Sequence, residues 1–407
     1  MRFKTGRVVL PLAVAGALAL TACSNGGSDN NSAGGGGLGS GASSSSSGSS
    51  SNATYKIAFQ GPLSGDNQQL GINEVNGVEL AVEQANASGD LGFKLDLFKG
   101  DDVGTPDQAP SVAAKVLQDS SILGVVGPSF SGATKAVASN YGQANVVMIS
   151  PSATNDTLTT SGFPTFYRVV PPDSLEGNEL ATYLAGKKYK KVAVIDDTTD
   201  YGKGVADTVR TTLEKAGTAV QPISVVNTTT DYGATAAQVN SAGADAVFYG
   251  GYDVQAAQLA KALDAAGFKG DKFTGNGGKS TAFTKGAGSS GDGWYFSCGC
   301  ADAVTAPAAK AFTDAYKKKY NTDPSTYSPE AFDAANALID AIKTAAKSGT
   351  PTRQSVADAV KNLNYKGITT TVKFAQGGEL EQSSQVINLF QQKNGVITTL
   401  GDIKTQK

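Results

Sequence analysis

The fold of this chain is decided by the stretch Ile122-Leu123-Gly124-Val125-Val126-Gly127-Pro128-Ser129-Phe130-Ser131-Gly132-Ala133-Thr134. The apolar run at its start is typical of a short buried strand, and the Gly, Pro and Ser residues after it predict a turn that opens a helix. A helix N-terminus with free backbone N–H groups and a serine hydroxyl can bind an anion. Serine is also a common helix cap, so both interpretations stay open at this point.

Short strand-like runs and alanine-rich helical stretches alternate along the rest of the chain, which is typical of βαβ units and parallel sheets. The first set of expected strands covers residues 55–59, 93–98, 122–126 and 146–149, with helices over 77–87 and 108–117. The second set, after Pro171 and Pro172, covers 192–195, 223–226, 246–249 and 273–275, with helices beginning at Leu175, Gly202, Val254, Ala306, Pro329 and Arg353. The chain is therefore predicted to be an α/β protein with two Rossmann-like lobes. Ligands of such sheets bind beyond the carboxyl ends of the strands.

The N-terminus predicts export. Lys4 and Arg7 precede an apolar run over residues 8–20 that is too short to span a membrane, so it is interpreted as a cleaved signal peptide over residues 1–22. The string Leu20-Thr21-Ala22-Cys23 resembles the lipobox of bacterial lipoproteins, in which Cys23 would be diacylated. The alternative is an ordinary signal peptide with an incidental cysteine. Residues 23–53 are rich in Gly, Ser, Asn and Asp and are expected to form a flexible tether.

Composition excludes several classes of function. The formal net charge of −2 provides no field for nucleic acid. The chain has no histidine, so neither a Ser-His-Asp triad nor a histidine-ligated zinc site can form, and no G-x-S-x-G elbow is present. An enzyme is therefore disfavoured, and no cofactor or metal is expected. With Cys23 lipidated, Cys298 and Cys300 remain, and a local disulfide is favoured over metal binding or free thiols.

Hydroxyl-rich and aromatic loops follow several of the expected strands. Residues 148–155 read Met-Ile-Ser-Pro-Ser-Ala-Thr-Asn, so this loop and the one at 127–134 can converge on one carboxylate. In the second lobe, Tyr201 and Tyr252 follow strands and would either wall a ligand or pack in the core. Gly202-Lys203-Gly204 lacks the spacing of a nucleotide-binding loop.

Together these loops resemble those of the type I periplasmic solute-binding proteins of ABC importers, in the leucine/isoleucine/valine-binding branch. The resemblance rests on Gly61-Pro62-Leu63-Ser64-Gly65, residues 148–154, Asp200-Tyr201-Gly202 and Gly250-Gly251-Tyr252. It implies two lobes with parallel sheets, joined by a hinge of three crossovers near Val170, residues 298–301 and residues 370–374. Lobe I would comprise residues 54–170 and 302–371, and lobe II residues 171–301 and 372–407.

The resemblance also implies a ligand site. Ser131 and Thr154 would hold a ligand carboxylate, the backbone carbonyl of Ser152 would accept from an ammonium group, and Tyr201 and Tyr252 would cover the ligand. Ser129 and Ala153 are further candidates in the loops that carry Ser131 and Thr154, and Asn276 is a candidate in the loop after the strand near Phe273. Leu70 stands where branched-chain binders often carry an aromatic residue, which predicts a different side-chain pocket.

One departure concerns the ammonium group. Amino-acid binders of this branch usually place an acid in the loop after the strand near Phe273, whereas here Asn276 or Gly277 takes that position and Lys279 adds a positive charge. Burying an unpaired ammonium is costly. Asp253 or Glu330 could substitute for the acid, although the sequence does not place either.

The function predicted from these features is that of a monomeric, lipid-anchored receptor on the outer face of the cell membrane. It would capture a small carboxylate-bearing solute, such as a branched-chain amino acid or a related amide or acid, and deliver it to an ABC permease. The alternative is a ligand sensor that signals to a membrane partner, and the sequence does not separate the two.

Overall fold

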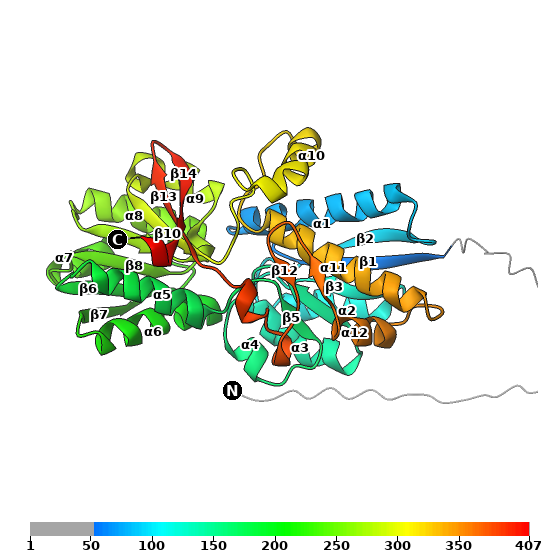
Figure 1. The fold of residues 1–407 in the computed structure, drawn as a ribbon. Helices are drawn as coiled ribbons and strands as arrows, with labels where there is room; N and C mark the ends of the chain where they lie inside the picture. Colours follow the sequence, from blue (N-terminus) through cyan, green and yellow to red (C-terminus); the bar gives the residue numbers. More distant parts are fainter. Residues whose placement is uncertain (1–52, 407) are drawn as a thin grey trace, which may run out of the picture. The chain divides into compact units, whose positions relative to one another are not determined.

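Two sheets organise residues 53–406, the part of the chain that the computed structural model describes (Figure 1). The expected signal segment, Cys23 and all but the last residue of the expected tether lie outside these residues. Within residues 53–406, no helix combines the length and apolar character needed to cross a membrane. The predicted α/β class with two sheets of parallel strands is confirmed, and the second sheet also carries two antiparallel strands at one edge.

The first sheet has five parallel strands in the order β2-β1-β3-β4-β5. Its strands are β1 Thr54–Gly61, β2 Lys94–Asp101, β3 Ile122–Val126, β4 Val147–Ser150 and β5 Phe166–Arg168. The helices around it are α1 Gln68–Ser88, α2 Ala109–Gln118, α3 Ser131–Gln143, α4 Thr157–Thr160, α10 Lys310–Tyr320, α11 Ser328–Ala346 and α12 Arg353–Val360. Helices from the two ends of the sequence therefore cover one sheet.

Strand β3 shows why a continuous apolar run folds in this place. Val125 packs with Val137 in the core on one face of the sheet. Val126 packs with Leu338 in the core on the other face. Because helices cover both faces, every residue of β3 is buried and the usual alternation of polar and apolar residues is absent.

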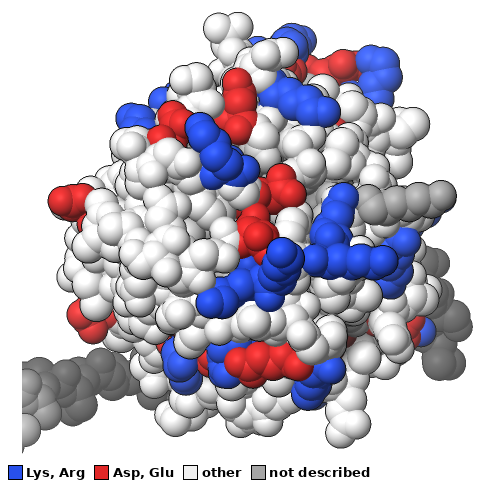
Figure 2. Space-filling view, turned by 90° about the vertical axis from the view of Figure 1, so that its left-hand side faces the viewer, with Lys and Arg blue, Asp and Glu red and all other residues white. Residues whose placement is uncertain are grey.

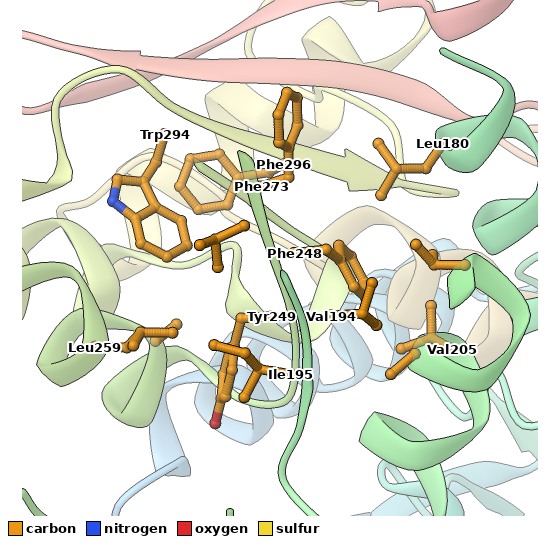
Figure 3. Packing of buried hydrophobic residues seen from close by; sticks show 14 of the residues in the cluster. Leu180, Val194, Ile195, Val205, Phe248, Tyr249, Leu259, Phe273, Trp294 and Phe296 are labelled. Carbon is orange, nitrogen blue, oxygen red and sulfur yellow. The ribbon is translucent and has the colours of Figure 1, made fainter. Parts of the chain in front are cut away.

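The second sheet has the order β14-β13-β10-β9-β8-β6-β7, parallel from β10 to β7, with β13 and β14 antiparallel. Its strands are β6 Lys191–Asp196, β7 Ala219–Ser224, β8 Ala246–Gly250, β9 Asp271–Thr274, β10 Trp294–Cys298, β13 Asn388–Lys393 and β14 Val396–Asp402. Its helices are α5 Asp173–Gly186, α6 Asp200–Lys215, α7 Gly233–Ser241, α8 Asp253–Ala265 and α9 Thr281–Ala287. Aromatic side chains fill its core, among them Phe248, Phe273, Trp294 and Phe296 (Figure 3).

Short elements complete the fold. They are the paired strands β11 Tyr365–Lys366 and β12 Thr371–Val372, and the 3-10 turns η1 Asn276–Gly278, η2 Gly288–Gly291, η3 Pro307–Ala309, η4 Gln376–Gly378, η5 Gln382–Ser384 and η6 Ile403–Thr405. Two predicted elements are displaced. The strand expected at 223–226 is β7, which begins at Ala219, and the helix expected at Ala306 begins at Lys310. Pro222 is tolerated in β7 because an edge strand has one unpaired side.

The chain passes between the sheets three times. The first passage follows β5 and the second follows β10, close to the expected positions. The third differs from the expected 370–374, because the segment that contains η4 still packs on β5: Gly378 lies against the backbone of Phe166, and Glu379 pairs with Arg168. Ser384 still forms hydrogen bonds with Thr370 and Thr371 at β12, so the last passage lies between Ser384 and Asn388, where β13 begins.

Charges of both signs are spread over the molecular face in Figure 2. Lys and Arg side chains lie beside Asp and Glu side chains over much of this face, and the area to the left of its centre is white, with acidic side chains at the left edge. The formal net charge of the chain is −2. This face therefore presents no extended field of one sign.

Candidate ligand-binding site between the two sheets

The loops after β3 and β4 meet at the carboxyl ends of these neighbouring strands. The Ser152 hydroxyl donates to the Ser129 carbonyl (2.7 Å), and the Asn155 N–H donates to the Ser131 hydroxyl oxygen (3.2 Å). Ser131, Ser152, Ala153 and Thr154 are all buried there. The convergence expected from the sequence is thus present in the fold.

Ser131 and Thr154 have hydrogen-bonding capacity left for a ligand. Ser131 is the first residue of α3, where backbone N–H groups are free, and its hydroxyl accepts from Asn155 while keeping its own hydrogen. The Thr154 hydroxyl is buried and makes no hydrogen bond of normal geometry, although it lies close enough to the buried Asp173 carboxyl to oppose the rise in the pKa of that acid. Two hydroxyls and a helix N-terminus can together bind a carboxylate.

Ser129 has a different environment from the one expected. Its hydroxyl donates to Glu74 (2.5 Å), a fully buried carboxyl on α1. Burial raises the pKa of Glu74 to about 8, which the hydrogen bond from Ser129 partly opposes. Ser129 therefore links its loop to α1 through its hydroxyl, and its carbonyl accepts a hydrogen bond from the Ser152 hydroxyl.

An aromatic cluster joins the two sheets next to these loops. Phe130, which precedes α3, stacks on Tyr252, which precedes α8, with ring centroids 4.2 Å apart. Tyr201 lies near the start of α6, and the centroid of its ring is 5.3 Å from that of Tyr252. Leu70 of α1 belongs to the same buried cluster. The predicted residues Leu70, Tyr201 and Tyr252 are therefore brought together, and Phe130 is an addition.

Tyr327 is a second residue that the sequence analysis missed. It precedes α11, belongs to the same buried cluster, and carries a hydroxyl that is buried without a hydrogen-bond partner. Its φ of 69° is left-handed, which is unusual for a non-glycine residue. A tyrosine directly before Ser328-Pro329, a helix start, is the signal in the sequence.

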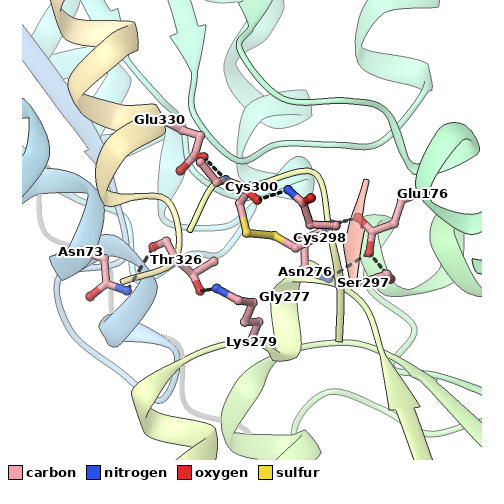
Figure 4. The surroundings of a disulfide bond; sticks show 12 residues. Asn73, Glu176, Asn276, Gly277, Lys279, Ser297, Cys298, Cys300, Thr326 and Glu330 are labelled. Atoms are coloured by element: carbon pink, nitrogen blue, oxygen red, sulfur yellow. Dashed lines mark hydrogen bonds between the residues drawn. A yellow bond between two sulfur atoms is a disulfide. The ribbon is translucent and has the colours of Figure 1, made fainter. Parts of the chain in front are cut away.

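Asn276 is buried in the loop after β9 and is paired with an acid from α5. Its backbone N–H and side-chain amide donate to Glu176 (3.0 and 2.5 Å), and the Ser297 hydroxyl donates to the same carboxylate (2.7 Å; Figure 4). Burial raises the pKa of Glu176 to about 7 against the effect of these three donors. The sequence signal for Glu176 is its helical spacing from the buried Leu180.

The two acids proposed from the sequence as substitutes have other partners. Asp253 accepts from the Ser280 hydroxyl (2.5 Å) and from its neighbour's N–H. Glu330 accepts from the Ala301 N–H (2.7 Å), and Lys279 acts on it electrostatically. Lys279 itself is buried and donates to Thr326 (3.1 Å). Neither acid makes a hydrogen bond with the loop at residues 275–278.

Cys298 and Cys300 form a disulfide where the chain leaves β10 (Figure 4). This is the local pairing that the sequence favoured. The disulfide loop touches the other passages between the sheets: Gly299 packs so closely on Pro171 that a Cβ would lie 2.4 Å from its ring, and Asn388 donates to the Cys300 carbonyl (3.1 Å). The hinge strands are thus packed together at one point.

Side chains also link the two lobes around the site. Lys135 of α3 forms an ion pair with Asp200 of α6 (2.8 Å), and the Asn155 side chain donates to the Asp200 carbonyl (2.6 Å). No group of three or more His, Cys, Asp or Glu side chains in residues 53–406 is arranged to hold a metal ion. The described site is built from hydroxyls, amides, carboxylates and aromatic rings.

Comparison with known proteins gives consistent matches over nearly all of the described chain. The sequence profile of the periplasmic binding protein family matches residues 54–395. The chain is 32% identical over 345 residues to Leu/Ile/Val-binding protein homolog 3 of Brucella melitensis, covering 83% of this chain and 91% of that protein. It is 31% identical over 336 residues to the leucine-, isoleucine-, valine-, threonine- and alanine-binding protein of Pseudomonas aeruginosa, and the match covers 81% of this chain and 87% of that protein. Its structure is similar to that of the branched-chain amino acid transporter substrate-binding protein LivJ of Streptococcus pneumoniae in complex with isoleucine, with a TM-score of 0.77, 28% identity, and 86% and 99% coverage.

Proposed function

We propose that this chain, which belongs to the family of periplasmic binding proteins, captures a small solute for an ABC importer. The solute would be a branched-chain amino acid or a related small carboxylate. Members of this family are solute-binding proteins that act outside the cytoplasm. The relatives from Brucella and Pseudomonas are named for binding leucine, isoleucine and valine. The related LivJ structure holds isoleucine.

The observation that carries the proposal is the pairing of two hydroxyl donors with an aromatic cluster. Ser131 and Thr154 lie on adjoining loops, buried and with donor capacity to spare. Tyr201 and Tyr252 approach from the other lobe. An α-carboxylate on the hydroxyls would place a short side chain against the rings and Leu70.

Binding would favour the closed arrangement of the lobes. The ligand would touch hydroxyls of the first lobe and tyrosines of the second, so it would bind the closed state more tightly than an open one. The ion pair between Lys135 and Asp200 would add to closure. A closed, loaded form is what a permease would need to recognise.

The proposal includes location and partners. Cys23 would carry the lipid and residues 24–52 would act as the tether, keeping the protein near a permease in the same membrane. The protein would act as a monomer, with the solute and the permease subunits as its partners.

Calorimetric titration of the purified chain with leucine, isoleucine and valine tests the proposal. We expect saturable binding of at least one of them, and Ser131→Ala and Thr154→Ala should each weaken it by about 1–3 kcal/mol because the carboxylate loses a charge-assisted hydrogen bond. Thr160→Ala is the control, because that hydroxyl is exposed and bonds only to Asp156. Absence of binding by the parent would overturn the function, and unchanged affinity in both variants would overturn the carboxylate site.

A further inference from the structure

The site contains more buried acids than cations. Tyr327 experiences the charges of Glu74, Asp173, Glu176 and Glu330, all of them buried. Among the described cations nearby, Arg168 is paired with Glu379, and Lys279 acts on Glu330. A buried carboxylate without a cation is costly, so the site is prepared for a ligand that brings positive charge.

Glu176 accepts more hydrogen bonds than the other acids of this group. It accepts three hydrogen bonds, from the backbone and side chain of Asn276 and from Ser297. Glu74 accepts one, from Ser129, and burial raises its pKa to about 8. Hydrogen bonds to a carboxylate favour its charged form, so these three donors favour ionisation of Glu176.

Glu176 also lies next to the residues that would enclose a ligand. A Cβ on Gly275 would lie 2.7 Å from the Tyr201 hydroxyl and 2.9 Å from Glu176 Oε1, so these two oxygens flank the same glycine. The Tyr201 hydroxyl accepts from the Gly277 N–H (3.0 Å). The Glu176 carboxylate thus lies close to the Tyr201 hydroxyl.

The spacing from the carboxylate site fits an α-amino acid. The Asp173 N–H donates to the Thr154 carbonyl (2.8 Å), so α5 begins beside the loop that carries the Thr154 hydroxyl. Glu176 follows three residues later, about 4.5 Å further along the helix axis. The carboxylate and ammonium of an amino acid are attached to the same carbon, so their protein partners must be close neighbours.

We propose that Glu176 supplies the negative charge that holds the ammonium group of an amino-acid ligand, in place of an acid in the loop at residues 275–278. The inference rests on the proposed function and assigns its specificity for an amino group to α5. Asn276 then orients the Glu176 carboxylate through two hydrogen bonds. Asp253 and Glu330 are not needed for this role.

Two ligands separate this inference from the proposed function. Calorimetry compares L-leucine with 4-methylpentanoate, which is leucine without its amino group, on the parent and on Glu176→Gln. We expect Glu176→Gln to lose about 10- to 100-fold in leucine affinity and to change by less than about 3-fold for 4-methylpentanoate, because only leucine carries the ammonium. The control is Glu179→Gln, the same change on the same helix, where the carboxylate pairs with Lys404 instead.

Moving the charge provides a second variant. Glu176→Gln combined with Asn276→Asp keeps one carboxylate between the same two positions, and should recover most of the lost leucine affinity. Leucine affinity within 3-fold of the parent in Glu176→Gln, equal losses for both ligands, or no recovery in the double variant would each overturn the assignment. A parent that binds neither ligand would overturn the proposed function itself.

Discussion

Arg168 provides a demanding test of how the site is supported. Its guanidinium is completely buried and pairs with Glu379, donating through Nε to Glu379 Oε1 (2.8 Å) and through Nη2 to Oε2. It also donates to the carbonyls of Ala153 (3.3 Å) and Asn155 (2.9 Å), which flank Thr154. One side chain therefore ties the segment around η4 to the loop that carries the proposed carboxylate ligand.

The perturbation is Arg168→Met, which keeps an unbranched apolar stem and removes every donor. Breaking a buried ion pair by removing one partner costs about 3–5 kcal/mol, because the other charge is left without compensation. The Glu379 side chain keeps 20% of its surface exposed, so water can reach it and the lower part of that range applies. Two carbonyls that lose their donor add to the loss. We therefore expect the free energy of unfolding to fall by roughly 3–4 kcal/mol.

Urea unfolding followed by circular dichroism measures this loss, and calorimetry with leucine measures its effect on the site. We expect leucine affinity to fall about tenfold, because the loop around Thr154 is held less firmly. The matched control is Lys373→Met, which removes the exposed ion pair with Glu381 and should cost less than about 1 kcal/mol. A loss below about 1 kcal/mol in Arg168→Met, with unchanged affinity, would refute the reasoning.

Two further predictions concern pH and the disulfide. Burial raises the pKa of Glu74 to about 8 and that of Glu176 and Glu330 to about 7, from 4.5, so the folded protein binds more protons than the unfolded chain between pH 4.5 and 8. The unfolding free energy without ligand should therefore be higher at pH 5.5 than at pH 8, and equal or greater stability at pH 8 in urea titrations would contradict this. Replacing Cys298 and Cys300 by serine opens a loop of only a few residues, so we expect the free energy of unfolding to fall by roughly 1.5 kcal/mol, measured by thermal or urea unfolding. A fall of more than about 4 kcal/mol would contradict this local role and show that the disulfide stabilises the whole fold.

Much of the architecture follows from local pattern. Residues 122–126 are apolar throughout because both faces of a parallel sheet are covered, and this pattern predicts β3 with its observed bounds. Strands β13 and β14 were not predicted, because polar residues and a two-residue connection characterise a half-exposed hairpin rather than a βαβ unit. The third passage lies later in the chain than the sequence predicts. The segment around η4 has no regular pattern, and its position depends on the ion pair between Arg168 and Glu379.

The candidate site divides in the same way. The loops that carry Ser131, Thr154, Tyr201 and Tyr252 are predicted because each follows a strand, and the carboxyl ends of parallel strands share one edge of a sheet. The roles of these four residues are what the family resemblance implies. Ser129 is a further candidate for ligand binding from the sequence, and in the structure its hydroxyl donates to Glu74. Which way a side chain points in a loop depends on contacts from another element, here α1.

The sequence by itself predicts an export signal, and it determined the two α/β lobes and the loops in which hydroxyls and tyrosines gather. These features depend on composition and on periodicity within short windows. Only the tertiary structure decided that Glu176, Phe130 and Tyr327 lie with these loops at the candidate ligand site. Glu176 and Asn276 are 100 residues apart in the chain and meet at hydrogen-bond distance. A buried carboxylate derives its charge and its role from neighbours that folding brings together, and no local pattern encodes those neighbours.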